Sequence, residues 1–321
     1  MTRPRGHSPG DQVGMVTHPA CLEHDPGPGH PERRERLLAV MDRLEASGLA
    51  SEMESLSAQP AQPNDLERIH PRTYVDHVRA AVLSGASHVD STDANVGPSS
   101  FDAALASAGG ALTAVDRTLE GTGLRSFVAI RPPGHHAEES FAMGFCLFNN
   151  AAIAARRALE HPDIDRVAIV DWDVHHGNGT QHLFEKDPSV FYASLHQFPH
   201  YPGTGAASER GFGDGEGATL NCPMAAGTGT DEWVRAFEGE ILPALDRYAP
   251  QFVIISAGFD AHALDPLSET RLTEDAYTSM TRSLRALADQ HAEGRLVSLL
   301  EGGYSLEGLA LSVEAHVSSL L

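Results

Sequence analysis

The chain has 321 residues, of which 41% are hydrophobic and 21% charged, and its 44 acidic and 23 basic residues give a formal net charge of -21. This length supplies a core that needs no disulfide or structural metal, and so acidic a surface repels nucleic acid phosphates, which argues against a nucleic acid partner. No apolar run approaches the roughly 18 residues of a transmembrane helix, and the N-terminal segment lacks the apolar stretch of a secretory signal, so we expect no membrane association.

The cysteines indicate the compartment of the protein, and the net charge indicates the kind of ligand that it would attract. Cys21, Cys146 and Cys222 are widely spaced and form no CxxC pair, which indicates reduced thiols and a cytoplasmic location. The negative charge favours cationic ligands, but it would equally serve solubility or a salty habitat. Charge alone therefore leaves the ligand open.

Five short apolar runs predict strands. Their near-continuous apolar character is typical of strands that are covered on both faces. In chain order, the runs span residues 126–131, 167–171, 190–195, 252–257 and 296–300.

Amphipathic stretches alternate with these runs and predict helices at 31–47, 99–120, 149–160, 231–248, 273–293 and 305–320. Ser99 followed by Asp102 predicts a capping box at the start of the second helix. The alternation predicts an α/β fold with a mostly parallel central sheet and helices on both faces. Because there is no internal repeat and no long linker, we expect residues 1–321 to form a single domain.

A histidine pair follows the first of these strands. His135 and His136 stand in RPPGHHA, and adjacent histidines in a loop cannot easily face one direction, so we expect different roles for them. Each needs a partner that fixes its tautomer and basicity. Asp171 and Asn178 are available as partners. Taken alone, such a pair would indicate only surface residues.

Two aspartates and two histidines follow the next strand, in DWDVHHGNG. Side chains at alternate positions of an extended strand share a face, so Asp171, Asp173 and His175 would point together. Asp173 and His175 then form a candidate pair of metal ligands, because carboxylate oxygen and imidazole nitrogen suit zinc or a similar divalent ion. The alternative is a histidine at a helix N-cap beside solvated aspartates.

Two later strands also end in candidate site residues. Asp260 can project over the sheet edge toward Asp173 and His175, and three protein ligands would leave a coordination position for water. Tyr304 follows two glycines that permit a tight turn, and its phenol could donate a hydrogen bond to a developing oxyanion. This set indicates metal-assisted amide hydrolysis. Neither G-x-S-x-G nor HExxH is present, which disfavours a serine hydrolase and a metalloprotease of that type.

These residues stand in motifs that resemble the histone deacetylase family, within the arginase/deacetylase fold. From about residue 24 to 304 the motifs are HPERRERL, RPPGHHAEESFAMGFCLFNN, VDWDVHHGNGTQHLF, SLHQFPHYPGTG, SAGFDAHALDPL and LEGGY. Asparagine at position 178 resembles class II members, and the compact chain resembles bacterial or archaeal deacetylases. The resemblance implies a zinc-dependent amidohydrolase, with iron(II) as an alternative metal, that removes acetyl or another short acyl group from acylated lysine or a similar cationic amine.

The resemblance implies a role for each residue that matches a family motif. The implied zinc ligands are Asp173, His175 and Asp260. The implied catalytic groups are His136 as general base and acid, His135 as its charge-stabilising neighbour, Asp171 and Asn178 as their partners, and Tyr304 as the group that polarises the carbonyl. A structural potassium ion is implied at the side chains of Asp171 and Ser194, with backbone carbonyls of Asp173, His175 and Leu195.

The resemblance also implies a substrate tunnel. Phe145 and Tyr201 match its aromatic walls, with Gly144 alongside, and Tyr201 replaces the more usual phenylalanine. Asp93 lies near the position of a tunnel-rim residue that holds the substrate backbone. Leu267 occupies the place at which the polyamine-specific eukaryotic branch has a glutamate.

Three other functions stay open from the sequence. Acetylpolyamine deacetylation is the main alternative, although Leu267 argues against the eukaryotic form of that specificity. Arginase-like hydrolysis would need further ligands for two manganese ions, and a non-catalytic reader of acyl-lysine would have lost a catalytic position, yet every one is filled. The sequence does not give the oligomeric state, although relatives suggest a homo-oligomer, as a dimer or tetramer.

Overall fold

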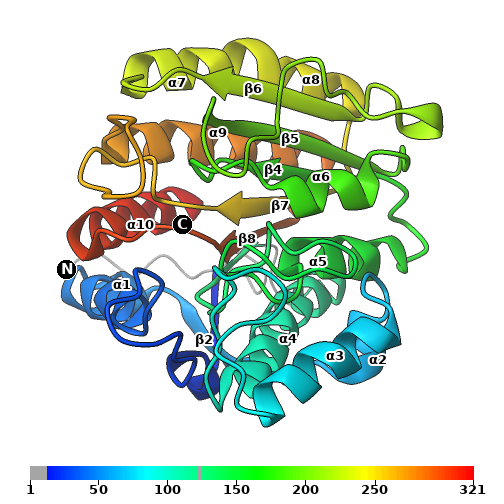
Figure 1. Ribbon diagram of the computed structural model, residues 1–321. Coiled ribbons are helices and arrows are strands. Elements are labelled where there is room, and N and C mark those ends of the chain that lie inside the picture. The colour runs from blue at the N-terminus through cyan, green and yellow to red at the C-terminus, as the bar shows by residue number, and fades with distance from the viewer. Residues whose placement is uncertain (1–12, 122–124) are drawn as a thin grey trace.

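The computed structural model describes residues 13–121 and 125–321, so the segment 1–12 and its expected lack of a secretory signal lie outside the described residues. Within these ranges, eight strands form one parallel sheet in the order β2-β1-β3-β8-β7-β4-β5-β6 (Figure 1). The strands are β1 (Gly14–Thr17), β2 (Glu54–Ser57), β3 (Arg125–Val128), β4 (Val167–Asp171), β5 (Val190–Gln197), β6 (Thr219–Met224), β7 (Phe252–Ala257) and β8 (Leu296–Leu300). The predicted α/β fold with a parallel sheet is confirmed.

Helices cover both faces of the sheet, as predicted. α4 and α5 pack side by side on one face, and α1, α10 and α9 pack in a row on the other (Figure 1). The helices are α1 (Glu35–Ala46), α2 (Pro63–Leu66), α3 (Arg72–Leu83), α4 (Ser100–Leu119), α5 (Asn150–Leu159), α6 (Asn178–Phe184), α7 (Thr230–Ala236), α8 (Leu242–Tyr248), α9 (Glu274–His291) and α10 (Leu306–Leu320).

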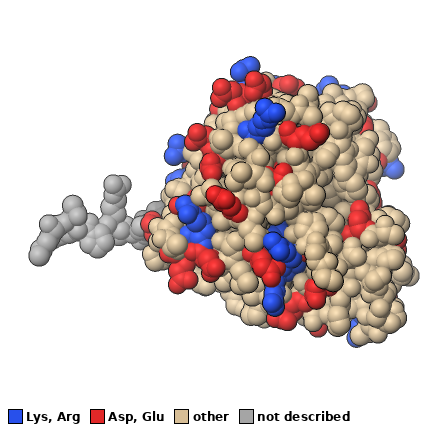
Figure 2. All heavy atoms as spheres, turned by 60° about the vertical axis from the view of Figure 1, so that its left-hand side comes forward, with Lys and Arg blue, Asp and Glu red and all other residues tan. Residues whose placement is uncertain are grey.

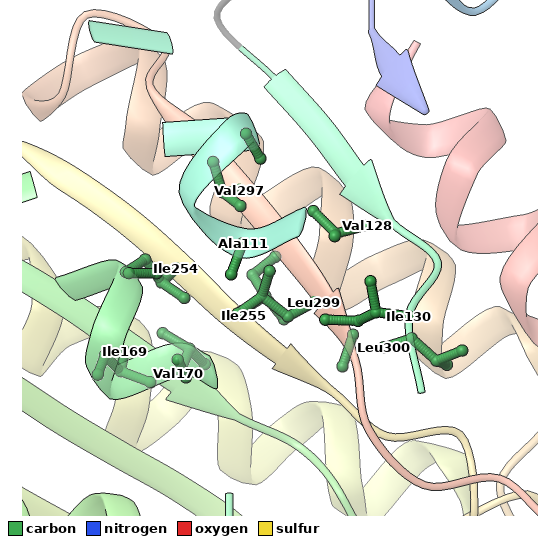
Figure 3. Packing of buried hydrophobic residues seen from close by; sticks show 14 of the residues in the cluster. Ala111, Val128, Ile130, Ile169, Val170, Ile254, Ile255, Val297, Leu299 and Leu300 are labelled. Atoms are coloured by element: carbon green, nitrogen blue, oxygen red, sulfur yellow. The ribbon is translucent and has the colours of Figure 1, made fainter. Parts of the chain in front are cut away.

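The centre of the sheet is the part that the sequence predicts best. Every residue of β4, β7 and β8 is buried, and the bounds of these strands coincide with the predicted runs. Figure 3 shows Ile169, Ile254 and Leu299 from these strands with Val128 of β3, and the strand register places these four side chains on one face of the sheet. Neighbouring strand residues point to opposite faces, so a strand between two helix layers needs apolar side chains at every position.

Small residues allow α4 to lie close to the sheet and its neighbours. A Cβ atom at Gly109 would lie 1.9 Å from the carbonyl oxygen of Gln59, and one at Gly110 would lie 2.9 Å from Cγ2 of Ile130. Neither space admits a side chain without displacement of a neighbour. The Ser-Ala-Gly-Gly-Ala run of this helix is therefore explained by packing.

Several predicted boundaries are wrong for local reasons. The run 126–131 leaves the sheet at Val128, because Arg131 turns away to pair with Glu32. The helix predicted from residue 31 begins at Glu35, because Glu32 is used in that same buried pair. The expected capping box is not formed, because Ser99 makes no side-chain cap hydrogen bond. Its neighbour Ser100 instead accepts a hydrogen bond at Oγ from the backbone N–H of Gly97.

Other differences concern elements with weak patterns. The predicted helix 231–248 is α7 and α8 joined by a π-helical turn, Phe237–Ile241, just before Pro243, which has no backbone N–H to donate. The strand run 190–195 continues to Gln197. Strands β1, β2 and β6 and helices α2, α3 and α6 were not predicted; β2, for example, alternates half-buried and exposed residues at the sheet edge.

The surface gives no sign of a membrane-spanning element. Across the described ranges, the helices are too short or too polar to cross a bilayer. On the face drawn in Figure 2, acidic and basic side chains are interspersed. The cytoplasmic location stays a prediction.

Candidate active site

Three potential metal ligands converge beyond the carboxyl ends of β4 and β7. Nδ1 of His175 lies 3.1 Å from Oδ1 of Asp173 and 3.1 Å from Oδ2 of Asp260, and all three residues are buried. β4 ends at Asp171, so Asp173 and His175 lie in the bend after it, and the predicted alternation along an extended strand is wrong. The bend brings these side chains together all the same.

The surroundings of this group fit a divalent metal ion. One ligand atom from each of Asp173, His175 and Asp260 lies within 4.8 Å of the others, which is the oxygen and nitrogen donor set that zinc takes in catalytic sites. Burial and the Asp173 carboxylate raise the pKa of Asp260, so the two carboxylates disfavour each other unless a cation lies between them. The backbone N–H groups of Val174 and Gly302 fix the carboxylates, at 2.8 Å each.

The two adjacent histidines have different partners. Nδ1 of His135 lies 3.0 Å from Oδ2 of Asp171, and Nδ1 of His136 lies 2.8 Å from Oδ1 of Asn178. Burial opposes protonation of His135, but Asp171 and Asp173 outweigh it and raise its pKa to about 10. Burial and the positive charge of His135 lower the pKa of His136 well below its usual value. His136 is thus the neutral imidazole, able to accept a proton, beside a cationic neighbour.

A buried ion-pair network, which the sequence reasoning missed, supports the site from behind. The carboxylate of Glu32 accepts hydrogen bonds from Arg131, at 2.6 Å to Nη2, and from Arg36, at 3.0 Å to Nη1. Arg36 also donates to the backbone carbonyl groups of Glu301 and Gly303. Gly303 directly precedes Tyr304. The only sequence signal for this network is the charged HPERRER segment, whose pattern predicts no more than part of a helix.

The carboxylate of Glu301 extends this support to the histidine pair. Oε2 accepts hydrogen bonds from the backbone N–H groups of Gly134, at 2.7 Å, and His135, at 3.2 Å. Oε1 accepts one from the hydroxyl of Ser256 on β7, at 3.2 Å. The loop with the histidines is thereby fixed to the ends of β7 and β8.

Replacing Glu32 with glutamine is expected to destabilise the fold by about 3–5 kcal/mol, because Arg131 and Arg36 would be left as buried cations without their carboxylate. Burial opposes ionisation of Glu32, but the Arg131, His24 and Arg36 charges lower its pKa from 4.5 to about 2. The contribution of Glu32 to the free energy of unfolding is therefore fully present above pH 4.5 and is lost as the pH falls toward 2. Urea unfolding at several pH values measures both effects.

The matched control for this variant is Glu35→Gln, at a partly exposed carboxylate that forms an ion pair with the exposed Arg34 at 3.5 Å. We expect it to change the free energy of unfolding by less than about 1 kcal/mol. Equal unfolding midpoints for the two variants would contradict the assigned role of Glu32.

A cavity of about 260 Å³ leads to the candidate metal ligands. Its lining residues are Asp93, His136, Gly144, Phe145, His175, His200, Tyr201, Leu267 and Tyr304. Gly144 and Phe145 both have positive φ, and a Cβ atom at Gly144 would lie 2.3 Å from Cδ2 of His136, so glycine is required there. All five tunnel residues expected from the sequence thus line one cavity.

The cavity mouth carries a polar pair. The Tyr201 hydroxyl donates to Oδ2 of Asp93 at 2.8 Å, and the backbone N–H of Gly144 donates to Oδ1 at 3.1 Å. The sequence reasoning missed His200, whose ring stacks on that of His175 with centroids 5.0 Å apart.

Tyr304 lines the same cavity. Its ring meets Phe145 edge-on, with centroids 5.7 Å apart, and the Arg36 guanidinium lies 5.0 Å from the ring centre. Desolvation raises the pKa of the Tyr304 phenol well above its usual value, although Arg36 opposes this. The phenol therefore keeps its proton and can donate a hydrogen bond.

The two side chains expected at a potassium site lie on neighbouring strands. Asp171 on β4 and Ser194 on β5 are direct partners in the strand register, and Leu195 follows on β5. The Ser194 hydroxyl is 2.8 Å from Nδ1 of His196.

Comparisons with known proteins agree with this architecture. The domain family described as "Histone deacetylase domain" matches residues 30–320. A histone deacetylase-like amidohydrolase of Pseudomonas aeruginosa is 41% identical over 295 residues, which cover 91% of this chain and 75% of the other. The crystal structure of the HDA15 HD domain superposes with a TM-score of 0.91 at 37% identity, over 96% of this chain and 88% of the other. The chain belongs to the histone deacetylase family.

A further relative carries a different substrate in its name. The human polyamine deacetylase HDAC10 is 39% identical over 301 residues, which cover 90% of this chain and 44% of the human protein. The family relationship supports a hydrolase that acts on amides.

Proposed function

We propose that the protein is a zinc-dependent deacetylase that hydrolyses acetyl-lysine or a similar short acyl-lysine amide. The observation that carries this proposal is the buried Asp173–His175–Asp260 group at a cavity that His136 and Tyr304 also line. When bound there, zinc would lower the pKa of a water molecule and polarise the amide carbonyl. Iron(II) would suit the same ligands.

The side chains around the cavity supply the remaining steps. His136, a neutral base held by Asn178, would take the proton from water and return it to the leaving amine. The Tyr304 phenol would donate a hydrogen bond to the oxygen on which negative charge develops. His135, kept cationic by Asp171, would stabilise that charge from behind. No serine or cysteine nucleophile is needed.

The shape of the cavity favours an acylated lysine. Phe145 and Tyr201 provide aromatic walls for the four-carbon stem, and Leu267 adds apolar surface. Asp93 is the one carboxylate at the mouth in the described part of the lining, where it could accept a hydrogen bond from a substrate backbone N–H. Acylation converts the charged lysine amine into a neutral amide, so the acylated side chain suits an apolar tunnel.

A comparison of kcat/KM on an acetyl-lysine peptide, N-acetylputrescine and N8-acetylspermidine tests this proposal. We expect the peptide to be preferred. A preference for the small amines would instead support polyamine deacetylation, which the human relative's name suggests and for which Asp93 could meet a distal ammonium. Leu267 disfavours that function because it presents no charge to such a cation.

A potassium ion beside the metal site is part of the proposal. The support is the placement of Asp171 and Ser194 side by side on β4 and β5, with the backbone of Asp173, His175 and Leu195 nearby in sequence. A homo-oligomer is likewise proposed only from the family, and sedimentation of the purified chain tests it.

Replacing Gly258 with alanine is expected to reduce zinc content and turnover together by at least about 10-fold. The new Cβ atom would lie 2.1 Å from Oδ2 of Asp173, so this carboxylate would have to move. Gly239→Ala is the matched control, because a Cβ atom there meets nothing within 4 Å. Metal analysis and acetate release measure the effect, and full zinc content in the Gly258 variant would contradict the assignment of Asp173.

A further inference from the structure

The side chain of Glu138 lies directly behind the partner of the candidate general base. Nδ2 of Asn178 donates to Oε1 of Glu138 at 2.5 Å, while Oδ1 of the same asparagine is 2.8 Å from Nδ1 of His136. The other contacts of this amide nitrogen are longer, at 3.4 Å to the His136 carbonyl and 3.4 Å to Sδ of Met143. Glu138 is therefore the strongest partner of the Asn178 amide nitrogen among the described residues.

An asparagine amide has a donor end and an acceptor end of nearly equal shape. A carboxylate only accepts hydrogen bonds, so Glu138 can pair with the nitrogen end of Asn178 and not with the oxygen end. The oxygen end must then face His136, and Nδ1 of that histidine must carry the proton. The lone pair needed to accept a proton from water is left on Nε2. The flipped amide would reverse this pattern and put the lone pair on the wrong nitrogen.

The network continues from Glu138 to the surface. Nδ1 of His182 on α6 lies 2.8 Å from the same Oε1 atom, and this hydrogen bond raises the pKa of His182. The side chains of Glu138 and His182 are 24% and 39% exposed, whereas Asn178 is buried. His182 thus fixes the Glu138 carboxylate from the solvent side while Asn178 binds it from within.

We propose that Glu138 is a positioning residue that sets the orientation of the Asn178 amide and, through it, the Nδ1–H tautomer of His136. This inference rests on the proposed function, in which His136 is the general base. Glu138 would act only through Asn178 and would not touch the substrate. Its contribution should therefore be found in kcat and not in KM.

The test uses two variants of nearly unchanged shape that reverse hydrogen-bond direction and that, taken together, keep the net charge. Glutamine at position 138 can donate as readily as accept, so Glu138→Gln admits the flipped Asn178 amide, and we expect kcat to fall roughly 10-fold with KM nearly unchanged. Adding Asn178→Asp removes the ambiguity, because a carboxylate accepts at both ends: one oxygen from His136 and the other from the new amide at position 138. We expect the double variant to recover kcat to within about threefold of the starting protein.

Glu139→Gln is the matched control, since it makes the same chemical change one residue away at an exposed side chain. Normal kcat in Glu138→Gln would overturn the proposal, as would a double variant no faster than the single one. Zinc content and thermal unfolding show whether each variant is folded and loaded.

Nitrogen-15 NMR of labelled histidines separates this inference from the proposed function. The Nδ1 and Nε2 shifts of His136, identified by their loss in His136→Ala, are expected to report the Nδ1–H tautomer in the starting protein and the double variant, and a mixture in Glu138→Gln. An unaltered tautomer in Glu138→Gln would contradict the inference. A failure of the starting protein to hydrolyse any acylated amine would contradict the proposed function and leave the tautomer result standing.

Discussion

Tyr304→Phe is expected to lower kcat by about 10²- to 10³-fold, equivalent to about 3–4 kcal/mol, while zinc content is unchanged. The variant removes one hydroxyl from the cavity lining and leaves the ring between Phe145 and Arg36. Because desolvation keeps the phenol protonated, the lost group is a hydrogen-bond donor, and its loss matters most where negative charge develops on the carbonyl oxygen. Steady-state kinetics with metal analysis of the same sample measures both quantities.

Tyr248→Phe provides the control for this effect. Tyr248 lies on α8, away from the cavity lining, and its hydroxyl donates to the Pro188 carbonyl at 3.0 Å. We expect kcat to be unchanged there. Near-normal kcat in Tyr304→Phe would remove the tyrosine from the proposed mechanism.

Asp260→Ala is expected to abolish turnover by a different route, through loss of the metal. Asp260 supplies one of three converging ligand atoms, and loss of a direct ligand should cost more than the roughly 10- to 100-fold in affinity that an outer partner costs. The variant also removes the repulsion between the Asp260 and Asp173 carboxylates. Loss of this repulsion favours the folded apoprotein. Zinc content after dialysis against a weak chelator measures the effect.

The control for Asp260→Ala is Asp163→Ala, at a carboxylate whose side chain is 84% exposed. It should retain zinc and activity in full. Retention of one zinc per chain by the Asp260 variant would show that this carboxylate is not a ligand.

The central strands could be predicted because burial on both faces demands apolar residues at every position, as in β4, β7 and β8. The edge strands could not, since four residues such as Glu54–Ser57 alternate between half-buried and exposed and carry no such demand. Helix starts failed where tertiary contacts overrode local patterns. Glu32 reads as a helix residue but is used as a buried partner of two arginines.

The residues of the candidate site likewise fall into those that the sequence could predict and those that it could not. His135, Asp173 and Asp260 follow apolar strands, and parallel strands bring their carboxyl ends to one edge of the sheet, so their meeting could be predicted. Glu138 and His200 could not be singled out, because their roles depend on the direction of a hydrogen bond and on the stacking of two rings. Neither property leaves a spacing pattern in the sequence.

Acetate release from an acetyl-lysine peptide, measured as zinc is returned to chelator-treated protein, shows directly whether the protein is a metal-dependent deacetylase. We expect no release without metal and a rise that saturates at one zinc per chain, because the described residues contain one such group of ligands. Activity that survives complete metal removal, or a fully loaded protein that releases no acetate from any acylated amine, would contradict it.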